Sequence, residues 1–512
     1  MIRFHPFRTG RLRPALALGA LLMLNACMDH RTAPTPESRP DAPFYALTDD
    51  NRLLSLNVRT PESPSATVRV SGLQPDERLL AMDFRPATGQ LYGVGSSSRL
   101  YVINPMTGAA RALGTGPFTP AISGDIVAID FNPTVDRLRL VTNTGQNLRL
   151  NPETGAVQAV DGAINGVAGA TITSVAYTNN RAGVTSTVLY DIDAATNKLY
   201  KQNPPNDGGL ELVGDLGLDI TGASGFDIAP DGRGLVAVTF GGRPELQAID
   251  LTTGRLQLLG SLPATVIALA IPTEPVAYAI DGSNNLLIFN PMAPGTPISK
   301  TLTGLQPGEL ILGIDFRPAN GQLYALGSTS RIYTLNTASG AAALVGGGPF
   351  TPALSGTSFG FDFNPAADRI RIVSNTGQNL RLNPNDFSTN AADGALNPGT
   401  PAAGSPAVSA AAYTNNFAGT TSTVLYDIDH TTDRLFRQVP PNDGTLVDVG
   451  PLGIDVTDSN GFDIGGMSNA AYAILSAGGS TKIYRINLDT GAATPVADFP
   501  SAVRGMAVGL GF

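Results

Sequence analysis

The chain has 512 residues and a formal net charge of −9, with 33 Lys and Arg against 42 Asp and Glu. This length exceeds what one ordinary hydrophobic core holds, so two or more domains are expected. The acidic balance argues against binding to nucleic acid and against binding to anionic lipid through surface charge. Frequent glycine (58) and proline (39) beside 42 % hydrophobic residues indicate short buried strands joined by many turns, which predicts an all-β protein.

The first 26 residues predict a secretory leader. An apolar run over 15–24 follows a basic region and is too short to remain as a membrane helix. The basic residues are Arg3, Arg8, Arg11 and Arg13. Leu24-Asn25-Ala26-Cys27 resembles the lipobox of bacterial lipoproteins, in which the cysteine is lipidated and becomes the first residue. Cys27 is the only cysteine, which favours this role over an ordinary secretory signal, and Met28 in place of Asp implies the outer membrane.

The segment over 27–43 is rich in proline and polar residues and has no apolar periodicity. Such a composition is typical of a disordered linker. We therefore expect a tether that holds a folded body away from the membrane.

The folded part is internally repeated. The ten residues Asn143–Pro152 return unchanged as Asn375–Pro384, 232 positions later. The repeat predicts two units, 44–271 and 276–512, joined by a Pro-Thr-Glu-Pro linker. Each unit contains similar segments at steps of 41 to 51 residues, the period of four-stranded propeller blades.

Ring closure can be predicted from the ends of the units. The first module, from Phe44 to Gly72, lacks a leading strand, whereas 504–512 is a leading strand with nothing after it. Completing one blade from both ends of a unit removes exposed sheet edges, and 265–271 could do so for the first unit. The sequence thus predicts two tandem five-bladed propellers, with one ten-bladed ring as the alternative.

The repeated stretch also predicts a strand register. The leucines on either side of its turn share one face if Leu140 opposes Leu148. Arg139 and Arg149 then lie opposite each other on the other face. Because like charges in that position are costly, each arginine needs a carboxylate from a neighbouring strand.

The pattern Asp-Phe-Asn-Pro-x-x-Asp-Arg-x-Arg, then Asn-Thr-Gly-Gln-Asn-Leu-Arg-Leu-Asn-Pro, then Tyr-Thr-Asn-Asn and Thr-Val-Leu-Tyr-Asp-Ile-Asp occupies 130–193 and again 362–429. It resembles a bacterial secreted family catalogued as domain of unknown function 4394. The resemblance implies a β-propeller fold and secretion, in two tandem copies behind a lipoprotein signal. It implies no reaction.

Histidine usage excludes several catalytic classes. The chain contains only His5, His30 and His430, the first in the leader and the second in the expected tether. Ser-His-Asp and Cys-His catalysis both lack parts, and zinc lacks its usual ligands. We therefore name no catalytic residue and expect no cofactor, apart from weak calcium candidates.

Strand-end aspartates recur at the same place in the modules. They could line a propeller channel as the carboxylate pairs of a glycosidase do. The favoured interpretation is structural, in which each accepts backbone N–H groups in the following turn. These residues are Asp83, Asp130, Asp227, Asp315, Asp362 and Asp463.

Calcium could bind around two Asp-Ile-Asp segments or two Asn-Asp-Gly segments, although no spacing matches an EF-hand loop. We favour ordinary polar turns over metal sites here. The residues are Asp191 and Asp193, Asp427 and Asp429, 206–208 and 442–444.

A ligand face is expected where the hairpin tip of the repeated stretch meets the connection between blades. Amides at this tip and a nearby exposed phenylalanine suit a binding surface. Alternatively, the Asn and Gly residues serve only the turn geometry, and the phenylalanine plugs the ring. The candidates are Phe118, Asn143, Gln146 and Asn147, and their equivalents Phe350, Asn375, Gln378 and Asn379.

The sequence therefore favours a lipid-anchored binding or scaffolding protein of the cell envelope, attached through Cys27, with an unknown protein or glycan partner. The alternative is a propeller hydrolase of glycans or lactones that uses carboxylates, with or without Ca²⁺. An enzyme should show converging carboxylates of raised pKa in a funnel, whereas a scaffold should show structurally satisfied aspartates.

Overall fold

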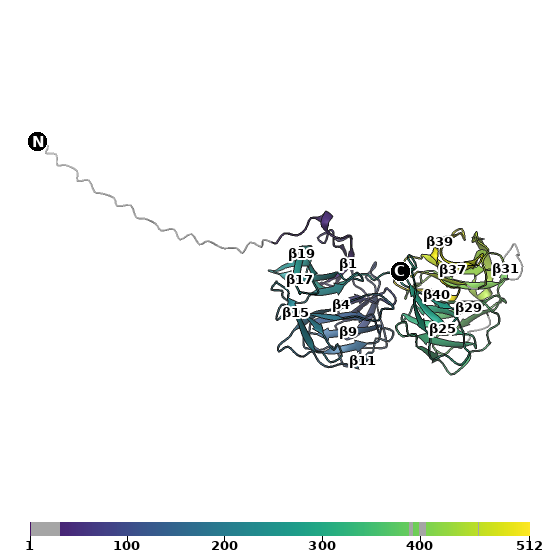
Figure 1. Ribbon diagram of the computed structural model, residues 1–512, viewed down its shortest axis with the longest axis horizontal. Helices are drawn as coiled ribbons and strands as arrows, with labels where there is room; N and C mark the ends of the chain where they lie inside the picture. The colour runs from purple at the N-terminus through teal and green to yellow at the C-terminus, as the bar shows by residue number, and fades with distance from the viewer. Residues whose placement is uncertain (2–30, 389–392, 399–405, 459) are drawn as a thin grey trace.

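Ten sheets build the protein, and they fall into two groups of five. The computed structural model describes Met1 and residues 31–388, 393–398, 406–458 and 460–512. Within these ranges the only helical elements are two 3-10 turns, η1 (Pro36–Ser38) and η2 (Pro441–Asp443). The N-terminal half (purple to teal) and the C-terminal half (green to yellow) form two bodies, and the C-terminus lies between them (Figure 1).

The first body is a ring of five four-stranded antiparallel sheets. Blade 1 comprises β20 (Val266–Ala270), β1 (Pro43–Thr48), β2 (Arg52–Asn57) and β3 (Ala66–Arg69). Blade 2 comprises β4 (Leu79–Phe84), β5 (Leu91–Gly95), β6 (Arg99–Ile103) and β7 (Ala110–Ala112). Blade 3 comprises β8 (Val127–Asn132), β9 (Arg137–Thr142), β10 (Asn147–Leu150) and β11 (Val157–Val160). Blade 4 comprises β12 (Ile172–Tyr177), β13 (Leu189–Asp193), β14 (Lys198–Gln202) and β15 (Leu210–Asp215). Blade 5 comprises β16 (Gly225–Ile228), β17 (Gly234–Phe240), β18 (Arg243–Ile249) and β19 (Leu256–Ser261).

The second body repeats this arrangement. Blade 6 comprises β40 (Val503–Val508), β21 (Ala277–Asp281), β22 (Asn285–Phe289) and β23 (Ile298–Thr301). Blade 7 comprises β24 (Ile311–Arg317), β25 (Gln322–Gly327), β26 (Arg331–Leu335) and β27 (Ala342–Val345). The described strands of blade 8 are β28 (Phe359–Asn364), β29 (Arg369–Ser374) and β30 (Asn379–Leu382). Blade 9 comprises β32 (Val408–Tyr413), β33 (Leu425–Asp429), β34 (Arg434–Gln438) and β35 (Thr445–Pro451), with β31 (Asn397–Pro398) added parallel to β35. Blade 10 comprises β36 (Gly461–Ile464), β37 (Ala471–Ala477), β38 (Ser480–Ile486) and β39 (Ala493–Asp498).

Each ring is closed by its own last strand. In the first ring β20 pairs with β1, and Leu269 opposes Ala46. In the second ring β40 pairs with β21, and Ala507 opposes Tyr278. The prediction of two tandem five-bladed propellers is confirmed, and these two closures exclude the ten-bladed alternative.

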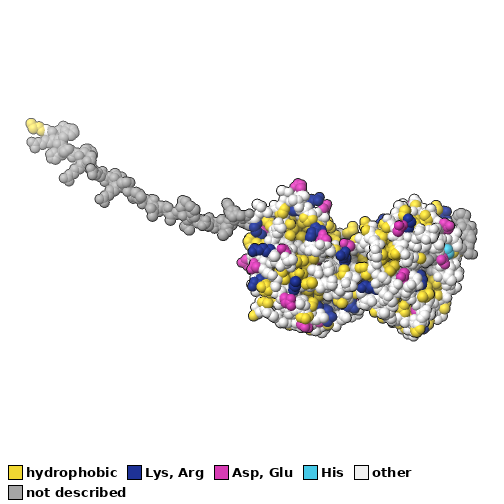
Figure 2. Space-filling view, in the orientation of Figure 1, with side chains coloured by type: hydrophobic (Ala, Val, Ile, Leu, Met, Phe, Trp, Pro, Cys, Tyr) yellow, Lys and Arg dark blue, Asp and Glu magenta, His cyan; other side chains and the backbone are white. Residues whose placement is uncertain are grey.

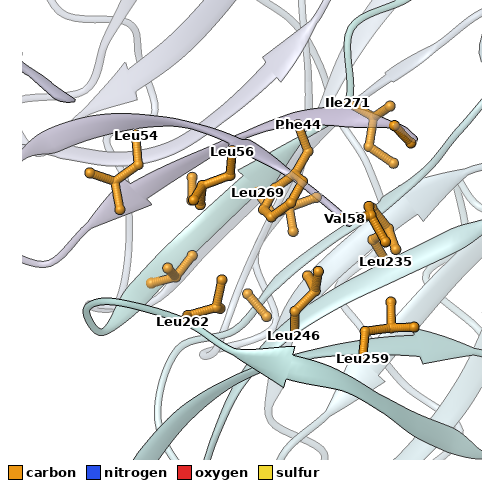
Figure 3. Close-up of a cluster of buried hydrophobic side chains, with 14 of the residues drawn as sticks. Phe44, Leu54, Leu56, Val58, Leu235, Leu246, Leu259, Leu262, Leu269 and Ile271 are labelled. Carbon is orange, nitrogen blue, oxygen red and sulfur yellow. The ribbon is translucent and has the colours of Figure 1, made fainter. Parts of the chain in front are cut away.

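The hydrophobic core lies between the blades. One cluster of buried side chains fills each space between neighbouring blades, five in each ring. Figure 3 shows the cluster between blades 1 and 5, where Phe44 and Leu56 face Leu246 and Leu259. Full burial of one such side chain contributes about 1.5–3 kcal/mol, so these layers hold the blades in a ring.

The repeated stretch forms the hairpin of β9 and β10 in the predicted register. Leu140 opposes Leu148, and Arg139 opposes Arg149. The carboxylate that the two arginines need is Asp161, which follows the neighbouring strand β11. It accepts hydrogen bonds from Arg139 Nη1 at 2.5 Å and from Arg149 Nε at 2.8 Å. The second ring repeats the bridge with Arg371, Arg381 and Asp393.

The expected tether is corrected over its described part. The segment from residue 31 to β1 contains η1, and it contacts the first propeller. Arg39 is 9 % exposed and donates to the carbonyl of Arg59 at 3.2 Å. Arg31 forms an ion pair with Glu245 at 3.1 Å and lies over the ring of Phe240. Polar composition suggested disorder, but these two arginines find partners on the blade surface.

The two propellers contact each other through loops and the chain end. Tyr278 donates its hydroxyl to the carbonyl of Ala87 at 2.9 Å, and the N–H of Gly511 donates to the carbonyl of Thr88 at 2.8 Å. The C-terminal residues therefore lie between the two rings, as Figure 1 shows. No helix in the described ranges is long and apolar enough to cross a bilayer.

Candidate functional site

The strand-end aspartates converge on the axis of each propeller. In each ring three of them lie on inner strands, are at most 1 % exposed, and place carboxylate oxygens within 4.8 Å of one another. We call these two clusters the axial triads. They are Asp83, Asp130 and Asp227 in the first ring, and Asp315, Asp362 and Asp463 in the second.

Backbone N–H groups from all five blades donate to the first axial triad. The donors and acceptors are Phe84 to Asp83 (2.7 Å), Phe131 to Asp83 (2.8 Å), Ile228 to Asp227 (2.6 Å), Ile271 to Asp227 (2.6 Å), and Tyr177 to Asp130. Five donors thus meet six carboxylate oxygens. In the described part of the chain, the triad oxygen left without a hydrogen-bond partner is Oδ1 of Asp130.

The second axial triad has the same arrangement. The donors and acceptors are Phe316 to Asp315 (2.7 Å), Phe363 to Asp315 (2.8 Å), Ile464 to Asp463 (2.6 Å), Val508 to Asp463 (2.5 Å), and Tyr413 to Asp362 (3.2 Å). Because each donor comes from a different blade, the triads join the blades at the axis. A buried N–H without an acceptor would cost about 1–3 kcal/mol, which gives the aspartates a structural role.

This geometry confirms part of the structural interpretation and corrects the rest. The aspartates do accept backbone N–H groups, but the donors belong to neighbouring blades as well as to the next residue. Only three of the five N–H donors in each ring directly follow an aspartate. The other two donors follow an alanine, namely Ala176 and Ala270 in the first ring, and Ala412 and Ala507 in the second. Three carboxylates already supply enough acceptors for five donors.

Burial raises the pKa values of the triads. The pKa of Asp83 lies well above its usual value because of burial and the negative charge of Asp227. Burial and the charge of Asp83 raise the pKa of Asp130 in the same way. Burial raises the pKa of Asp227 and that of Asp463 to about 7, against the opposing effect of their N–H donors.

The triads have the converging carboxylates expected of an enzyme, but they do not open to a funnel. Each side chain is at most 1 % exposed. Next to the first triad, the inner strands close around a cavity of about 10 Å³, lined by residues such as Ala81, Ile129 and Phe226. A cavity of this size admits no substrate.

The predicted ligand-face amides are used inside the protein. Gln146 donates to the carbonyl of Ala121 at 2.8 Å and accepts the N–H of Ser123 at 3.0 Å. Asn143 donates to Asp125 at 2.7 Å and accepts its N–H at 3.3 Å. The tip and the blade connection do lie together as expected, but the amides fasten one to the other.

Asn147 is 1 % exposed and also has internal partners. It accepts from Arg139 Nη1 at 2.8 Å and donates to the carbonyl of Gly162 at 2.9 Å. The equivalent amides of the second ring bond in the same way, namely Asn375 to Thr357, Gln378 to Ala353 and Ser355, and Asn379 to Arg371 and Gly394.

The expectation of exposed phenylalanines was wrong. Phe118 is 5 % exposed and Phe350 is 6 % exposed. Phe118 packs in the cluster between blades 2 and 3, and Phe350 packs in the one between blades 7 and 8, so neither plugs a ring axis. Large aromatic side chains gain more from this burial than from exposure on a connection.

The weak calcium candidates are separate groups. Asp193 and Asp429 accept hydrogen bonds from the turns that follow them, as polar turns predict. Asp191 and Asp427 are 0 % exposed, and none of their carboxylate oxygens has a hydrogen-bond partner among the described residues. Burial raises the pKa of Asp427 to about 8. The amides of the Asn-Asp-Gly segments accept from buried arginines, Asn206 from Arg139 and Asn442 from Arg371.

Two surface pockets were not predicted from the sequence. One, of about 480 Å³, lies in the first propeller and is lined by 40–43, 229–231, 233–235 and 271–274 among others. The other, of about 390 Å³, lies between the propellers, and we call it the inter-propeller pocket. Its walls include Ile103, Pro105 and Arg111 from the first ring, and Phe417, Met467 and Leu510 from the second.

Arg111 is the charged residue of the inter-propeller pocket. Its Nη2 donates to the carbonyl of Ala319 in the second propeller. Its Nε is buried and has no hydrogen-bond acceptor within the described part of the chain. Burial lowers the pKa of Arg111. Pattern analysis within one repeat could not find this site, because both repeats build it.

Taken together, the closed rings and their sealed axes define a tandem five-bladed β-propeller protein. The profile of the family described as domain of unknown function (DUF4394) matches residues 52–270 and again 285–507. The chain belongs to this family and contains two copies of its domain, which confirms the resemblance. No curated protein matches the chain.

Several solved structures resemble the chain at low identity. One is the extracellular domain of a one-component system of B. thetaiotaomicron, with 13 % identity and a TM-score of 0.24; the match covers 89 % of this chain and 58 % of that one. Another is PorZ, a bacterial surface component of the type-IX secretion system of Porphyromonas gingivalis, with 13 % identity, a TM-score of 0.26 and coverage of 89 % and 57 %. A third is the Dos1 propeller, with 12 % identity, a TM-score of 0.25 and coverage of 62 % and 82 %. No function follows from these similarities.

Proposed function

We propose that the protein is a lipid-anchored binding protein of the bacterial cell envelope, and that its ligand occupies the inter-propeller pocket. The observation that carries this proposal is Arg111, a half-buried residue whose Nε has no acceptor in the described part of the chain, in a pocket built by both repeats. A volume of about 390 Å³ falls within the range of small-molecule sites, roughly 300–1,000 Å³.

The chemistry of the walls indicates the class of ligand. Ile103, Phe417 and Met467 offer an apolar surface, and the half-buried Arg111 offers a positive charge. A ligand with an apolar body and a carboxylate or phosphate would cover the apolar surface and pair with the guanidinium. It could be a free molecule or the end of a protein or glycan partner.

The charge distribution on the surface favours a ligand that carries a single anionic group over a polyanion. On the face seen in Figure 2, basic and acidic side chains are scattered over both propellers and form no continuous basic stripe. The net charge of −9 opposes non-specific attraction of nucleic acid as well.

A hydrolase is the weaker candidate. The raised pKa values and the convergence of the axial carboxylates suit acid–base catalysis. However, a substrate must reach the catalytic oxygen, and the axial triads are at most 1 % exposed.

The binding proposal can be tested with 8-anilinonaphthalene-1-sulfonate, a fluorescent probe with an apolar body and one anionic group. The full chain should bind one equivalent, and Arg111→Gln should bind about tenfold more weakly because a charged hydrogen bond contributes about 1.5–3 kcal/mol. Arg243→Gln, at an exposed arginine of blade 5, is the matched control and should bind as the parent does. Equal binding by the parent and by Arg111→Gln would contradict the proposal.

The natural ligand can be sought by native mass spectrometry of protein purified from envelopes. We expect a bound mass on the parent that is absent from Arg111→Gln. A small bound mass would identify a free molecule, whereas co-elution of a protein or glycan would identify a partner.

The anchor is tested separately, since Cys27 lies outside the described residues. Cells fed an alkyne fatty acid should label the parent chain, and Cys27→Ser should lose the label and leave the membrane fraction. Labelling that persists in Cys27→Ser would contradict a lipid on this cysteine.

A further inference from the structure

The pocket of about 480 Å³ in the first propeller opens onto the hydrophobic cluster between blades 1 and 5, and we call it the blade 5 pocket. Leu235, Leu259 and Ile271 belong both to this cluster and to the pocket wall, and they lie on the right side of Figure 3. These three side chains are 6–8 % exposed, whereas Phe44 in the same cluster is 0 % exposed. This side of the cluster is therefore open to the pocket.

The second propeller covers the corresponding cluster with its own chain. Gly465 and Met467 follow the Gly-Phe-Asp-Ile strand β36, as Ala229 and Asp231 follow the identical strand β16. Phe512 packs against the cluster between blades 10 and 6, and its carbonyl accepts the N–H of Met467 at 2.8 Å. In the first propeller, Ala229 and Asp231 line the blade 5 pocket instead. The pocket thus lies where the second ring places an apolar side chain and a carbonyl group.

A buried hydroxyl in the pocket wall has no partner. Thr273 lines the blade 5 pocket and is 6 % exposed. Its Oγ1 is buried and forms no hydrogen bond with any described residue. Because an unsatisfied buried hydroxyl is unfavourable, a ligand atom that accepts its hydrogen bond gains affinity.

The charges around the pocket disfavour an anionic ligand. Arg233 in the wall is already paired, since its Nε donates to Asp231 at 2.6 Å. Asp41 and Glu274 add two further carboxylates to the wall. An anion would meet these acids without a free basic partner among the described wall residues, whereas a neutral ligand avoids the repulsion.

We propose that the blade 5 pocket binds a neutral small molecule with an apolar group and a carbonyl oxygen, such as an ester, an amide or a ketone. The apolar group would cover Leu235, Leu259 and Ile271, and the carbonyl oxygen would accept a hydrogen bond from Thr273. The volume of about 480 Å³ lies within the range of small-molecule sites, roughly 300–1,000 Å³. This site is separate from the inter-propeller pocket and does not depend on the function proposed for it.

The test uses 6-propionyl-2-(dimethylamino)naphthalene, a neutral fluorescent ketone whose emission shifts to the blue in an apolar site. The full chain should bind one equivalent with this shift. Ala248→Phe fills the pocket from blade 5 and should abolish saturable binding. Ala159→Phe adds the same side chain at a half-buried alanine of blade 3, and this control should bind as the parent does.

Thr273→Val keeps the shape of the side chain and removes only the hydroxyl. It should bind the probe about two- to tenfold more weakly, as expected for the loss of one neutral hydrogen bond. Equal affinities of the parent and Thr273→Val would overturn the proposal, whether or not Ala248→Phe folds. Absence of saturable binding by the parent would overturn it as well.

Arg111→Gln separates this proposal from the one on the inter-propeller pocket. The variant should bind the neutral probe as the parent does, because Arg111 does not line the blade 5 pocket. Loss of binding in Arg111→Gln together with unchanged binding in Ala248→Phe would place the probe between the propellers and overturn the proposal.

Discussion

Arg85 and Arg317 occupy equivalent positions in the two propellers, but within the described residues only Arg85 hydrogen-bonds to the other propeller. Its side chain is 2 % exposed, bonds to both oxygens of Asp136, and donates Nη1 to the carbonyl of Gly321 in the other propeller at 3.1 Å. Arg317 forms the same two-pronged contact with Asp368, but this pair is 12 % and 35 % exposed.

The difference extends to the next partner. Arg85 also forms an ion pair with Glu153, whereas Arg317 donates to the neutral Asn385 at 3.1 Å. The buried arginine, Arg85, thus has a second acidic partner, whereas the more exposed Arg317 does not. The comparison teaches that two nearly identical repeats diverge where they face each other, and that their internal arrangement stays the same.

The largest effect is expected from removing Arg85. Arg85→Met leaves Asp136 without its ion-pair partner in a nearly buried site and leaves Glu153 with only Arg137 at 4.0 Å, which should cost about 3–5 kcal/mol. Arg317→Met breaks a more exposed bridge and should cost about 1 kcal/mol. Urea unfolding followed by far-ultraviolet circular dichroism measures both. Equal losses in the two variants would show that the interface does not depend on Arg85.

A smaller effect is expected from removing residues 510–512. Leu510 is 1 % exposed, the N–H of Gly511 bonds to the first ring, and the carbonyl of Phe512 accepts the N–H of Met467 at 2.8 Å. Losing one buried leucine and the hydrogen bonds of Gly511 to Thr88 and of Met467 and Ser468 to Phe512 should cost about 2–4 kcal/mol. The two propellers should then melt as separate calorimetric transitions. Phe512→Ala keeps the backbone contacts and should have a weaker effect; a single unchanged transition in the truncated chain would contradict this view of the tail.

The smallest effect concerns acid stability. Burial alone would raise the pKa of Glu77, but hydrogen bonds from Ser97, Tyr101 and the N–H of Gln74 outweigh it and lower the pKa below its unfolded value of 4.5. The stabilisation from Glu77 is therefore present above pH 4.5 and is lost as the pH falls through the lowered pKa. Glu77→Gln should cost about 1 kcal/mol at pH 7.

Urea midpoints measured between pH 3 and pH 7 test this expectation. The parent should lose more stability than Glu77→Gln as the pH falls, because the glutamine does not titrate. Glu309→Gln changes the equivalent residue, which bonds to Thr329 and Tyr333, and compares the two rings. Parallel profiles for the parent and Glu77→Gln would contradict the role assigned to this carboxylate.

Features within one repeat could be predicted from the sequence. Strand periodicity, ring closure by β20 and β40, and the opposition of Arg139 and Arg149 follow from local patterns that recur along the chain. The need of those arginines for a carboxylate was also predictable, because like charges cannot face each other unpaired. The sequence did not identify Asp161 as that carboxylate, because the geometry of the next strand decides it.

Features that depend on several blades were predicted incompletely. The aspartates were identified as strand-end acceptors, but their meeting at an axis requires five blades at fixed angles. The burial of Phe118 depends on the packing of blades 2 and 3. The inter-propeller pocket depends on how the chain end positions the second ring, and no pattern within a repeat records that position.

The way in which each ring closes fixes the order in which the rings can be completed during biosynthesis. The closing strand of the first ring, β20, ends at Ala270, so that ring can finish folding before the second half of the chain becomes available. The closing strand of the second ring, β40, comes after every other strand of that ring. Premature termination anywhere in the second half would therefore leave a finished first propeller beside an open array of blades with unpaired edges.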